Sequence, residues 1–468
     1  MHVGAGTVGR PRSRGRSEAR PRGRQKQRLT RRGRILVRTG AALVVLLVAA
    51  GGTAAWLYQR LDGNIHASDI DGKVGGERPA NLSPGARNIL VVGSDSRAGA
   101  NASYGKGLDT MQSDTLMIVH IAANREWGAV VSLPRDSWVQ IPECDRGDGS
   151  SSRPNRFKLN SAFAVGGTTG DVGSAAACTI RTIEHNTGLR VDHFVSVDFQ
   201  GFKGMVNALD GIEVCPEQAI RDKKARLDLA AGCQTVRDEQ ALGYVRTRYS
   251  VGDGSDIGRI GRQQEFMRAL AAKAQEKLTS PGALYDFLDA ATSSITTDRA
   301  LAGIKPLTEL ATALRGIPQD RLTFMTVPNY PRELDVPSDR ANVSWQYPQA
   351  RQLFTALAQD QEVDKTELTS AEPVPAPTIA VRVLNGTGSP GQAAEVATDL
   401  RAAGYRVHDI GNAPSATATS VTYSHGLQQK AEALAARLGV PATAATSEEP
   451  AGDAVTLTLG PDFSGIRG

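Results

Sequence analysis

The chain has 468 residues, of which 40% are hydrophobic, so it can bury a substantial core and is long enough for two folded domains. Its net charge of +5 comes from the N-terminus, where 13 of the 54 Lys and Arg residues, but only one of the 49 acidic residues, precede Thr39. The remaining 41 basic and 48 acidic residues give the rest of the chain a net charge of −7, which excludes a strongly basic folded domain.

The N-terminus combines a basic tail with an apolar segment. Residues 1–38 are rich in Arg, Gly, Pro and Ser and poor in aliphatic residues, so we expect them to be disordered. Residues 39–58 carry no charge and have about the 20-residue length that a helix needs to cross a bilayer. Because basic residues beside such a helix stay in the cytoplasm, the rest of the chain is predicted to be extracytoplasmic, with Trp56 and Tyr58 at the outer interface.

Two alternatives exist for this region. The small residues from Ala49 to Ala54 could form the cleavage site of a signal peptide, although the apolar segment is long for that purpose. The arginines could bind nucleic acid through its phosphates. Membrane topology and attraction to anionic lipids account for them without such a partner, so we expect a single-pass cell-membrane protein and no nucleic-acid partner.

The four cysteines all follow the predicted membrane span, where an oxidising exterior permits disulfides. None has the C-x-x-C spacing that is typical of zinc sites. Three pairings are possible, and we favour Cys144 with Cys178 and Cys215 with Cys233 because each pair closes a short loop.

The pattern along the chain predicts two domains. After a linker at residues 59–85, short apolar segments of the kind buried in parallel sheets alternate with helix-like stretches, which indicates an α/β domain with helices on both faces of a sheet. A Pro- and Ala-rich linker at residues 361–378 precedes a second, smaller α/β domain at residues 379–464. Strands are expected at 88–93, 115–121, 128–133, 193–197, 379–384, 406–410, 420–423 and 454–459, and helices at 174–188, 199–209, 259–278, 344–359, 391–403 and 427–438.

Several common catalytic motifs are missing from the sequence. There is no G-x-S-x-G and no H-E-x-x-H. The segment from Gly99 to Lys106 is similar to a phosphate-binding loop, but five residues separate its glycines where that motif has four, so we interpret it as a Gly-rich surface loop.

Charged residues instead gather at the ends of the predicted strands, where α/β proteins bind ligands. Asp95 follows one strand, Asp114 precedes the next, and Arg135 and Asp136 follow a third. Two carboxylates with an arginine suit a divalent cation and a phosphate, since Mg²⁺ prefers one or two carboxylates together with substrate phosphates. The alternative is that both aspartates are turn or cap residues and that Arg135 and Asp136 form a local ion pair.

A second basic cluster follows further along the chain. If residues 244–248 are extended, Tyr244, Arg246 and Arg248 share one face, and adjacent guanidinium groups match phosphate oxygens. Asp256 is a candidate N-cap of the next helix. Arg259, Arg262 and Gln263 are spaced three and four residues apart, so they share one face of this helix. They lie close to its N-terminus, which attracts anions. We interpret Arg246, Arg248 and Arg259 as a diphosphate clamp.

These motifs, in this order, resemble the LytR-CpsA-Psr family over about residues 86–360, and residues 379–463 resemble the LytR C-terminal domain of actinobacterial members. The second resemblance rests on residues 383–388 and on the ending 459–463. The motifs of the first are residues 88–97, 113–117, 132–136, Lys158–Asn160 with Phe163, Asp192–Phe194 with Asp198 and Phe199, 210–214, 241–248 and 259–264.

The resemblance implies a three-layer α/β/α domain with a hydrophobic groove for a polyprenyl chain. Asp95 and Asp114 would hold Mg²⁺ or Mn²⁺. Asp256 would support the arginines or assist deprotonation of the acceptor, although Asp253 in the preceding loop leaves open which aspartate has that role. The catalytic residues would be Arg246, Arg248 and Asp256, and the pyrophosphate would contact Arg135, Lys158, Arg246, Arg248, Arg259, Arg262 and Gln263.

The implied reaction is attack by a peptidoglycan hydroxyl on a polyprenyl-pyrophosphate-linked glycopolymer, with charge stabilised by arginines and the metal. The partners are then the lipid-linked glycopolymer, peptidoglycan and the membrane. A polyprenyl-pyrophosphate pyrophosphatase would use the same groups with water, and a membrane-bound transcriptional regulator or a non-catalytic wall-binding scaffold are alternatives of another class. The C-terminal domain offers no acid–base pair, so we interpret it as an interaction or regulatory module.

Overall fold

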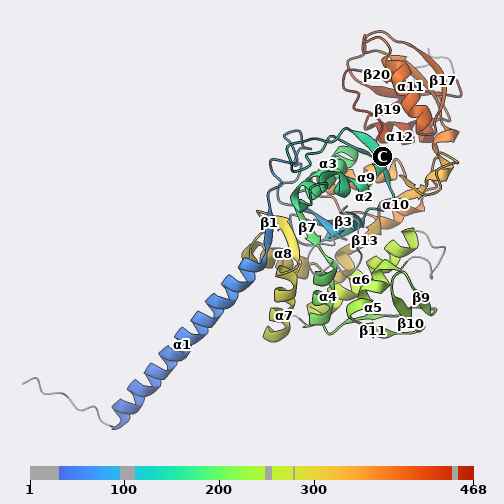
Figure 1. Cartoon of the computed structure of the whole chain (residues 1–468). Coiled ribbons are helices and arrows are strands. Elements are labelled where there is room, and N and C mark those ends of the chain that lie inside the picture. Colours follow the sequence, from blue (N-terminus) through green and yellow to red (C-terminus); the bar gives the residue numbers. More distant parts are fainter. Residues whose placement is uncertain (1–30, 95–110, 248–255, 278–279, 445–451, 468) are drawn as a thin grey trace, which may run out of the picture. The chain divides into compact units, whose positions relative to one another are not determined.

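The structure is a computed structural model of the whole chain and describes residues 31–94, 111–247, 256–277, 280–444 and 452–467. It has two compact units, residues 1–57 and residues 58–468. Helix α1 (Arg31–Asn64) contains the segment Arg38–Asn64, which is long and apolar enough to cross a membrane (Figure 1). The most apolar 18 residues of this segment are not buried by protein. Leu46 and Val48 in this helix are 68% and 69% exposed, a state that is stable in hydrocarbon rather than in water. The helix fits a single-pass membrane anchor.

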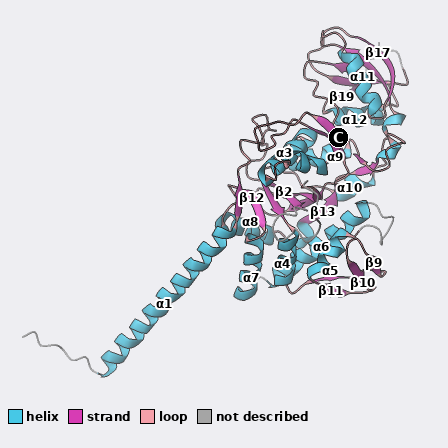
Figure 2. Cartoon of the chain, in the orientation of Figure 1, coloured by secondary structure: helices cyan, strands magenta, loops and turns pink. Residues whose placement is uncertain are grey.

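A seven-stranded mixed sheet forms the centre of the second unit (Figure 2). Strand β2 pairs in parallel with β7 and antiparallel with β3, which pairs antiparallel with β4. The short apolar runs therefore predicted β2, β3, β4 and β7, while no strand was predicted at β1, β12 or β13. The parallel arrangement expected of such runs was wrong for β3. In spatial order the strands are β1 (His66–Ser68), β12 (Ile295–Asp298), β7 (His193–Val197), β2 (Arg87–Ser94), β3 (Ser113–Ile121), β4 (Gly128–Ser132) and β13 (Leu322–Thr326).

Both faces of this sheet are buried, which explains why its strands are almost continuously apolar. Leu90 and Val92 of β2 belong to a core with α2 (Asn160–Gly166), α3 (Val172–Thr187) and α9 (Gln349–Ala358). Ile89 and Val91 point to the opposite face, toward α8 (Ile304–Gly316) and α6 (Asp256–Lys277). The α/β/α architecture predicted from the sequence is confirmed. Helix α9 begins later than expected because residues Val343–Trp345 form strand β15.

Smaller elements surround the central sheet. One group lies beside the candidate site: α4 (Phe199–Ala208), β8 (Ile212–Val214), β9 (Ile220–Asp222), β10 (Leu227–Leu229), β11 (Gln234–Val236), α5 (Asp238–Arg246) and α7 (Pro281–Thr292). The others are β5 (Trp138–Ile141), β6 (Asn155–Lys158), β14 (Asn329–Pro331), α10 (Lys365–Ser370) and the 3-10 helices Gln319–Arg321, Arg332–Leu334 and Ala376–Thr378.

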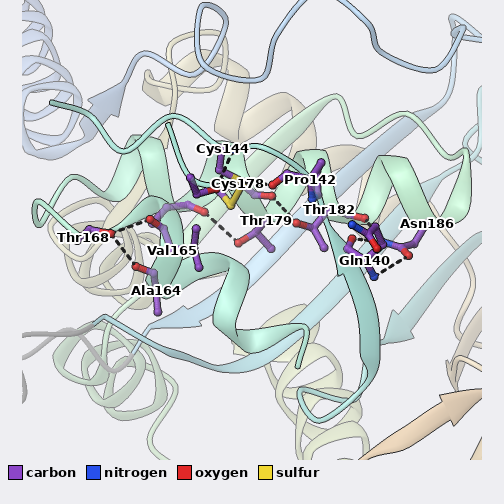
Figure 3. The surroundings of a disulfide bond; sticks show 12 residues. Gln140, Pro142, Cys144, Ala164, Val165, Thr168, Cys178, Thr179, Thr182 and Asn186 are labelled. Atoms are coloured by element: carbon purple, nitrogen blue, oxygen red, sulfur yellow. Dashed lines mark hydrogen bonds between the residues drawn. A yellow bond between two sulfur atoms is a disulfide. The ribbon is translucent and has the colours of Figure 1, made fainter. Parts of the chain in front are cut away.

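Two disulfides join the pairs favoured from the sequence, Cys144 with Cys178 and Cys215 with Cys233. The first ties the segment after β5 to helix α3 (Figure 3). Near the C-terminus of α3, the side-chain amide of Asn186 donates to the backbone carbonyl of Gln140 at 2.8 Å. The side-chain oxygen of Asn186 accepts from the backbone amide of Gln140 at 3.2 Å. β5 is therefore fixed to α3 at two points.

The C-terminal domain has its own core around a five-stranded sheet. It contacts the first domain through Arg437 of α12, whose side chain is 3% exposed and lies 3.7 Å from a carboxylate oxygen of Asp335. Asp335 also accepts hydrogen bonds from the Tyr330 and Ser344 hydroxyls. The elements are β16 (Ala380–Asn385), α11 (Gln392–Ala402), β17 (Arg406–Asn412), β18 (Ser420–Tyr423), α12 (Gln428–Leu438), β19 (Ala442–Ala444) and β20 (Val455–Leu459).

Candidate active site

The antiparallel pairing of β3 gathers polar residues at one edge of the sheet. Ser94 at the end of β2 pairs with Ser113 at the start of β3, and Met117 of β3 pairs with Ser132 at the end of β4. The segments that carry Asp114 and Arg135 therefore meet, and Nη1 of Arg135 lies 2.6 Å from a carboxylate oxygen of Asp114. Asp95, the second metal ligand that the resemblance implies, lies outside the described residues.

The Asp114–Arg135 pair continues into a charge network. The Nε of Arg135 lies 3.6 Å from a carboxylate oxygen of Asp136, and Nζ of Lys158 donates to the other oxygen at 2.7 Å. The local ion pair considered for Arg135 and Asp136 is therefore present, while Arg135 also reaches the cavity described next. Lys158 does not line that cavity, so its expected contact with pyrophosphate remains a prediction.

A cavity of about 540 Å³ lies between the sheet edge and helices α4, α5 and α6. Its polar residues come from the sheet edge, the N-cap of α4, the hairpin of β9 and β10, the end of α5 and the middle of α6. Its apolar residues come from β2, β3, α4, α5 and α6. The polar lining includes Gln112, Asp114, Thr115, Arg135, Asp198, Asp222, Lys224, Arg246 and Gln263. The apolar lining includes Val91, Met117, Phe199, Phe202, Met205, Leu242, Val245, Met267 and Leu270.

The extended conformation considered for residues 244–248 is absent from residues 244–246, which are helical. Residues Asp238–Arg246 form helix α5, with Asp238 and Glu239 in its first turn, where acidic side chains interact favourably with the helix dipole. Tyr244 is 2% exposed and packs against Phe266 with ring centroids 6.2 Å apart; burial raises its pKa. Arg246, the last residue of the helix, lines the cavity with its guanidinium 4.6 Å from the centre of the Phe199 ring. The two side chains therefore do not share a face.

Helix α6 brings two of its predicted ligands close to Arg246. Gln263 lines the cavity and donates to the Val245 carbonyl at 2.9 Å and to the Thr115 hydroxyl at 3.2 Å. Nη2 of Arg262 donates to the Thr247 carbonyl at 2.6 Å, and burial lowers the pKa of this guanidinium. Arg262 therefore supports the backbone beside Arg246 and is not part of the cavity lining. Arg248 and the side chains of Asp256 and Arg259 lie outside the described part of the chain.

The residues present fit a Mg²⁺ ion that is completed by substrate. Asp114 offers a carboxylate at the polar end of the cavity, and Mg²⁺ is commonly held by one or two carboxylates with phosphate oxygens and water. Within the described ranges, no group of three or more His, Cys, Asp and Glu side chains could hold a metal by itself. An ion held by Asp114 would be completed by oxygens of the ligand or of water.

Sequence reasoning missed Asp222 and Lys224, which also line the cavity. They lie at the end of β9 and in the turn before β10, on a short hairpin with no phosphate-binding pattern. Asp198, which the sequence placed only within a family motif, is the N-cap of α4 and accepts from the Gly201 amide at 2.8 Å. A basic residue in a hairpin turn gives no signal until the tertiary structure brings it to the site.

Apolar walls beside the cations of Arg135 and Arg246 and the amide of Gln263 suit an amphipathic anion, such as a long hydrocarbon chain with a phosphate head group. The profile of the LytR_cpsA_psr family matches residues 57–360, so the chain belongs to this family. A second profile, described as LytR cell envelope-related transcriptional attenuator, matches residues 378–463.

Named relatives are found in several bacteria. The chain is 38% identical over 203 residues to the probable cell wall biosynthesis protein LcpB of Corynebacterium glutamicum, covering 42% of this chain and 43% of LcpB. It is 28% identical to LcpA of the same organism, covering 80% of this chain and 75% of LcpA. It is also 28% identical to the polyisoprenyl-teichoic acid–peptidoglycan teichoic acid transferase TagT of Bacillus subtilis, covering 64% of this chain and 88% of TagT. Among solved structures, an Actinomyces oris LytR-Csp2A-Psr enzyme superimposes with a TM-score of 0.46 at 19% identity, covering 63% of this chain and 96% of that one.

The apolar walls are open to a direct test. We expect Met267→Glu to weaken binding of geranylgeranyl monophosphate at least about tenfold, because burying a carboxylate beside hydrocarbon costs several kcal/mol. Calorimetric titration of the full chain in nanodiscs measures the affinity. The control is Ala272→Glu, which places the same charge on an exposed position of α6. Equal affinities in the two variants would show that the hydrocarbon binds elsewhere.

Proposed function

We propose that this protein transfers a glycopolymer from a polyprenyl-pyrophosphate carrier to a hydroxyl of peptidoglycan, forming a phosphodiester. The observation that carries the proposal is the single cavity that joins apolar walls to Arg135, Arg246 and Gln263. Membership of the family and relatives named as peptidoglycan teichoic acid transferases support the reaction type.

The prenyl chain and the pyrophosphate of the substrate occupy different regions of this cavity. The prenyl chain lies among Phe202, Met205, Met267 and Leu270, where burial of hydrocarbon contributes about 25 cal/mol per Å². The pyrophosphate lies beside Arg246 and Arg135, whose guanidinium groups suit phosphate oxygens. Arg248 and Arg259 are proposed to add further contacts. The apolar helix is proposed to anchor the chain in the membrane that supplies the lipid, with the catalytic domain outside the cytoplasm.

The chemical step is a displacement at the phosphorus that bears the glycopolymer. The acceptor oxygen forms a bond to this phosphorus, the bond to the bridging oxygen breaks, and polyprenyl phosphate leaves with its electron pair. The acceptor proton passes to a base, for which Asp256 is the proposed candidate. Arg246 and Arg135 stabilise the charge that develops on the phosphate oxygens, and Gln263 helps to orient them. A bound Mg²⁺ would supply additional charge neutralisation at Asp114.

Removal of Arg246 tests the proposed site. We expect Arg246→Ala to slow transfer about 10- to 100-fold, since a hydrogen bond to a charged group contributes about 1.5–3 kcal/mol. The assay follows a polyprenyl-pyrophosphate oligosaccharide and peptidoglycan fragments by mass spectrometry. Arg237→Ala removes an exposed arginine just before the same helix and should leave the rate within about twofold. An unchanged rate in Arg246→Ala contradicts the proposed site, whereas release of free glycan phosphate regardless of acceptor indicates a pyrophosphatase.

Removal of the metal ion tests whether transfer depends on it. Chelation with EDTA should abolish transfer, and added Mg²⁺ or Mn²⁺ should restore it. Asp114→Asn should raise the Mg²⁺ concentration needed for half-maximal rate at least about tenfold, because an amide binds this hard cation more weakly than a carboxylate. Asp286→Asn changes an exposed aspartate of α7 and should leave that concentration unchanged. Full activity in EDTA would remove the metal from the mechanism.

A further inference from the structure

The residue between the two predicted clamp arginines is fully buried. Thr247, with an exposed fraction of 0%, follows the last residue of α5 and precedes Arg248. Its backbone leaves the helical conformation, with φ −62° and ψ 140°. Helix α5 therefore ends directly after Arg246.

Three hydrogen bonds hold Thr247 in place. Its amide donates to the Gly243 carbonyl at 2.9 Å and closes the end of α5. Its carbonyl accepts from Nη2 of Arg262 at 2.6 Å. Its hydroxyl donates to Oδ2 of Asp222 at 2.7 Å, inside the protein. The amide, the carbonyl and the side chain are thus bonded to partners in different segments.

Asp222 is itself fixed by the hairpin that carries it. Its side chain is 5% exposed, and its Oδ1 accepts from the amides of Lys224 at 2.9 Å and Ala225 at 3.0 Å. Oδ1 therefore stabilises the turn between β9 and β10, while Oδ2 accepts the hydrogen bond from the Thr247 hydroxyl. A carboxylate that accepts several hydrogen bonds is held more firmly than one with a single partner.

The neighbouring residue Val245 is fixed as well, because its carbonyl accepts from Gln263. The segment 245–247 is thus bonded to the β9–β10 hairpin through Asp222 and to α6 through Arg262 and Gln263. Side chains that bind a charged group in a defined geometry need such support, because a displacement of about 0.5 Å already weakens the contacts.

We infer that Asp222 and Thr247 form a buried positioning pair that aims Arg246 at the diphosphate of the substrate. The identity of the ligand rests on the proposed function, but the positioning role rests on the hydrogen bonds alone. Neither residue takes part in the reaction. Asp222 fixes the position of Thr247 through a hydrogen bond, and Thr247 fixes the end of α5, where the Arg246 side chain lies over the Phe199 ring.

Geranylgeranyl diphosphate binding by the full chain in nanodiscs tests the pair. Thr247→Val keeps the shape of the side chain and removes the hydroxyl, so it should weaken binding about tenfold, because Arg246 would then be in its binding position in only about a tenth of the molecules. Thr247→Ser retains the hydroxyl and should bind within about twofold of the unchanged protein. In an Arg246→Ala background, Thr247→Val should weaken binding by less than about threefold, because the arginine that it positions is gone.

This double-mutant cycle separates positioning from a general loss of structure. The inference is overturned if Thr247→Val does not weaken binding, or if Thr247→Ser weakens binding as much as Thr247→Val does. It is also overturned if Thr247→Val has an equally large effect without Arg246. If the unchanged protein binds the diphosphate but transfers no glycopolymer, the proposed function fails and the cycle still decides the positioning role. If the unchanged protein binds no diphosphate, both fail.

Discussion

Charged groups beside an apolar cavity must be neutralised by each other or by a ligand, because an unpaired charge next to hydrocarbon is unstable by several kcal/mol. At the sheet edge this constraint is met by the contact between Arg135 and Asp114, which antiparallel β3 brings together from segments 21 residues apart. At the end of α5 the Arg246 guanidinium lies 4.6 Å from the centre of the Phe199 ring, a cation–π contact that stabilises the charge without neutralising it. In the proposed reaction, the pyrophosphate would lie between these two cations and the prenyl chain would lie against the apolar walls.

Part of this arrangement could be predicted from the sequence. The runs at residues 88–93, 115–121 and 128–133 are β2, β3 and β4, since strands buried on both faces are apolar throughout. For that same reason the pattern carries no information on strand direction. The alternation over residues 244–248 suggested an extended segment, but residues up to Arg246 belong to helix α5. The acidic first turn and the buried Leu242 of α5 favour the helix more strongly than five alternating residues favour a strand. The role of residue 222 could not be predicted either, since its contact with residue 247 exists only in the tertiary structure.

The C-terminal domain is attached by more than a linker. Arg437 and Asp335 are both buried where the two domains meet, and Nη2 of Arg156 donates to the Ile466 carbonyl. Arg156 lies on β6, two residues before Lys158, which bonds to Asp136 of the charge network. Residues near the C-terminus are thereby connected to the strand that carries Lys158, although none of the domain's described residues lines the cavity.

The most direct test of the account is a crystal structure of the protein with a bound long-chain polyprenyl phosphate. The account predicts that the prenyl chain lies between α4 and α6, against Phe202 and Leu270, with the phosphate in contact with Arg246 and Arg135. A phosphate bound away from both arginines, or a prenyl chain that lies outside this cavity, would contradict it.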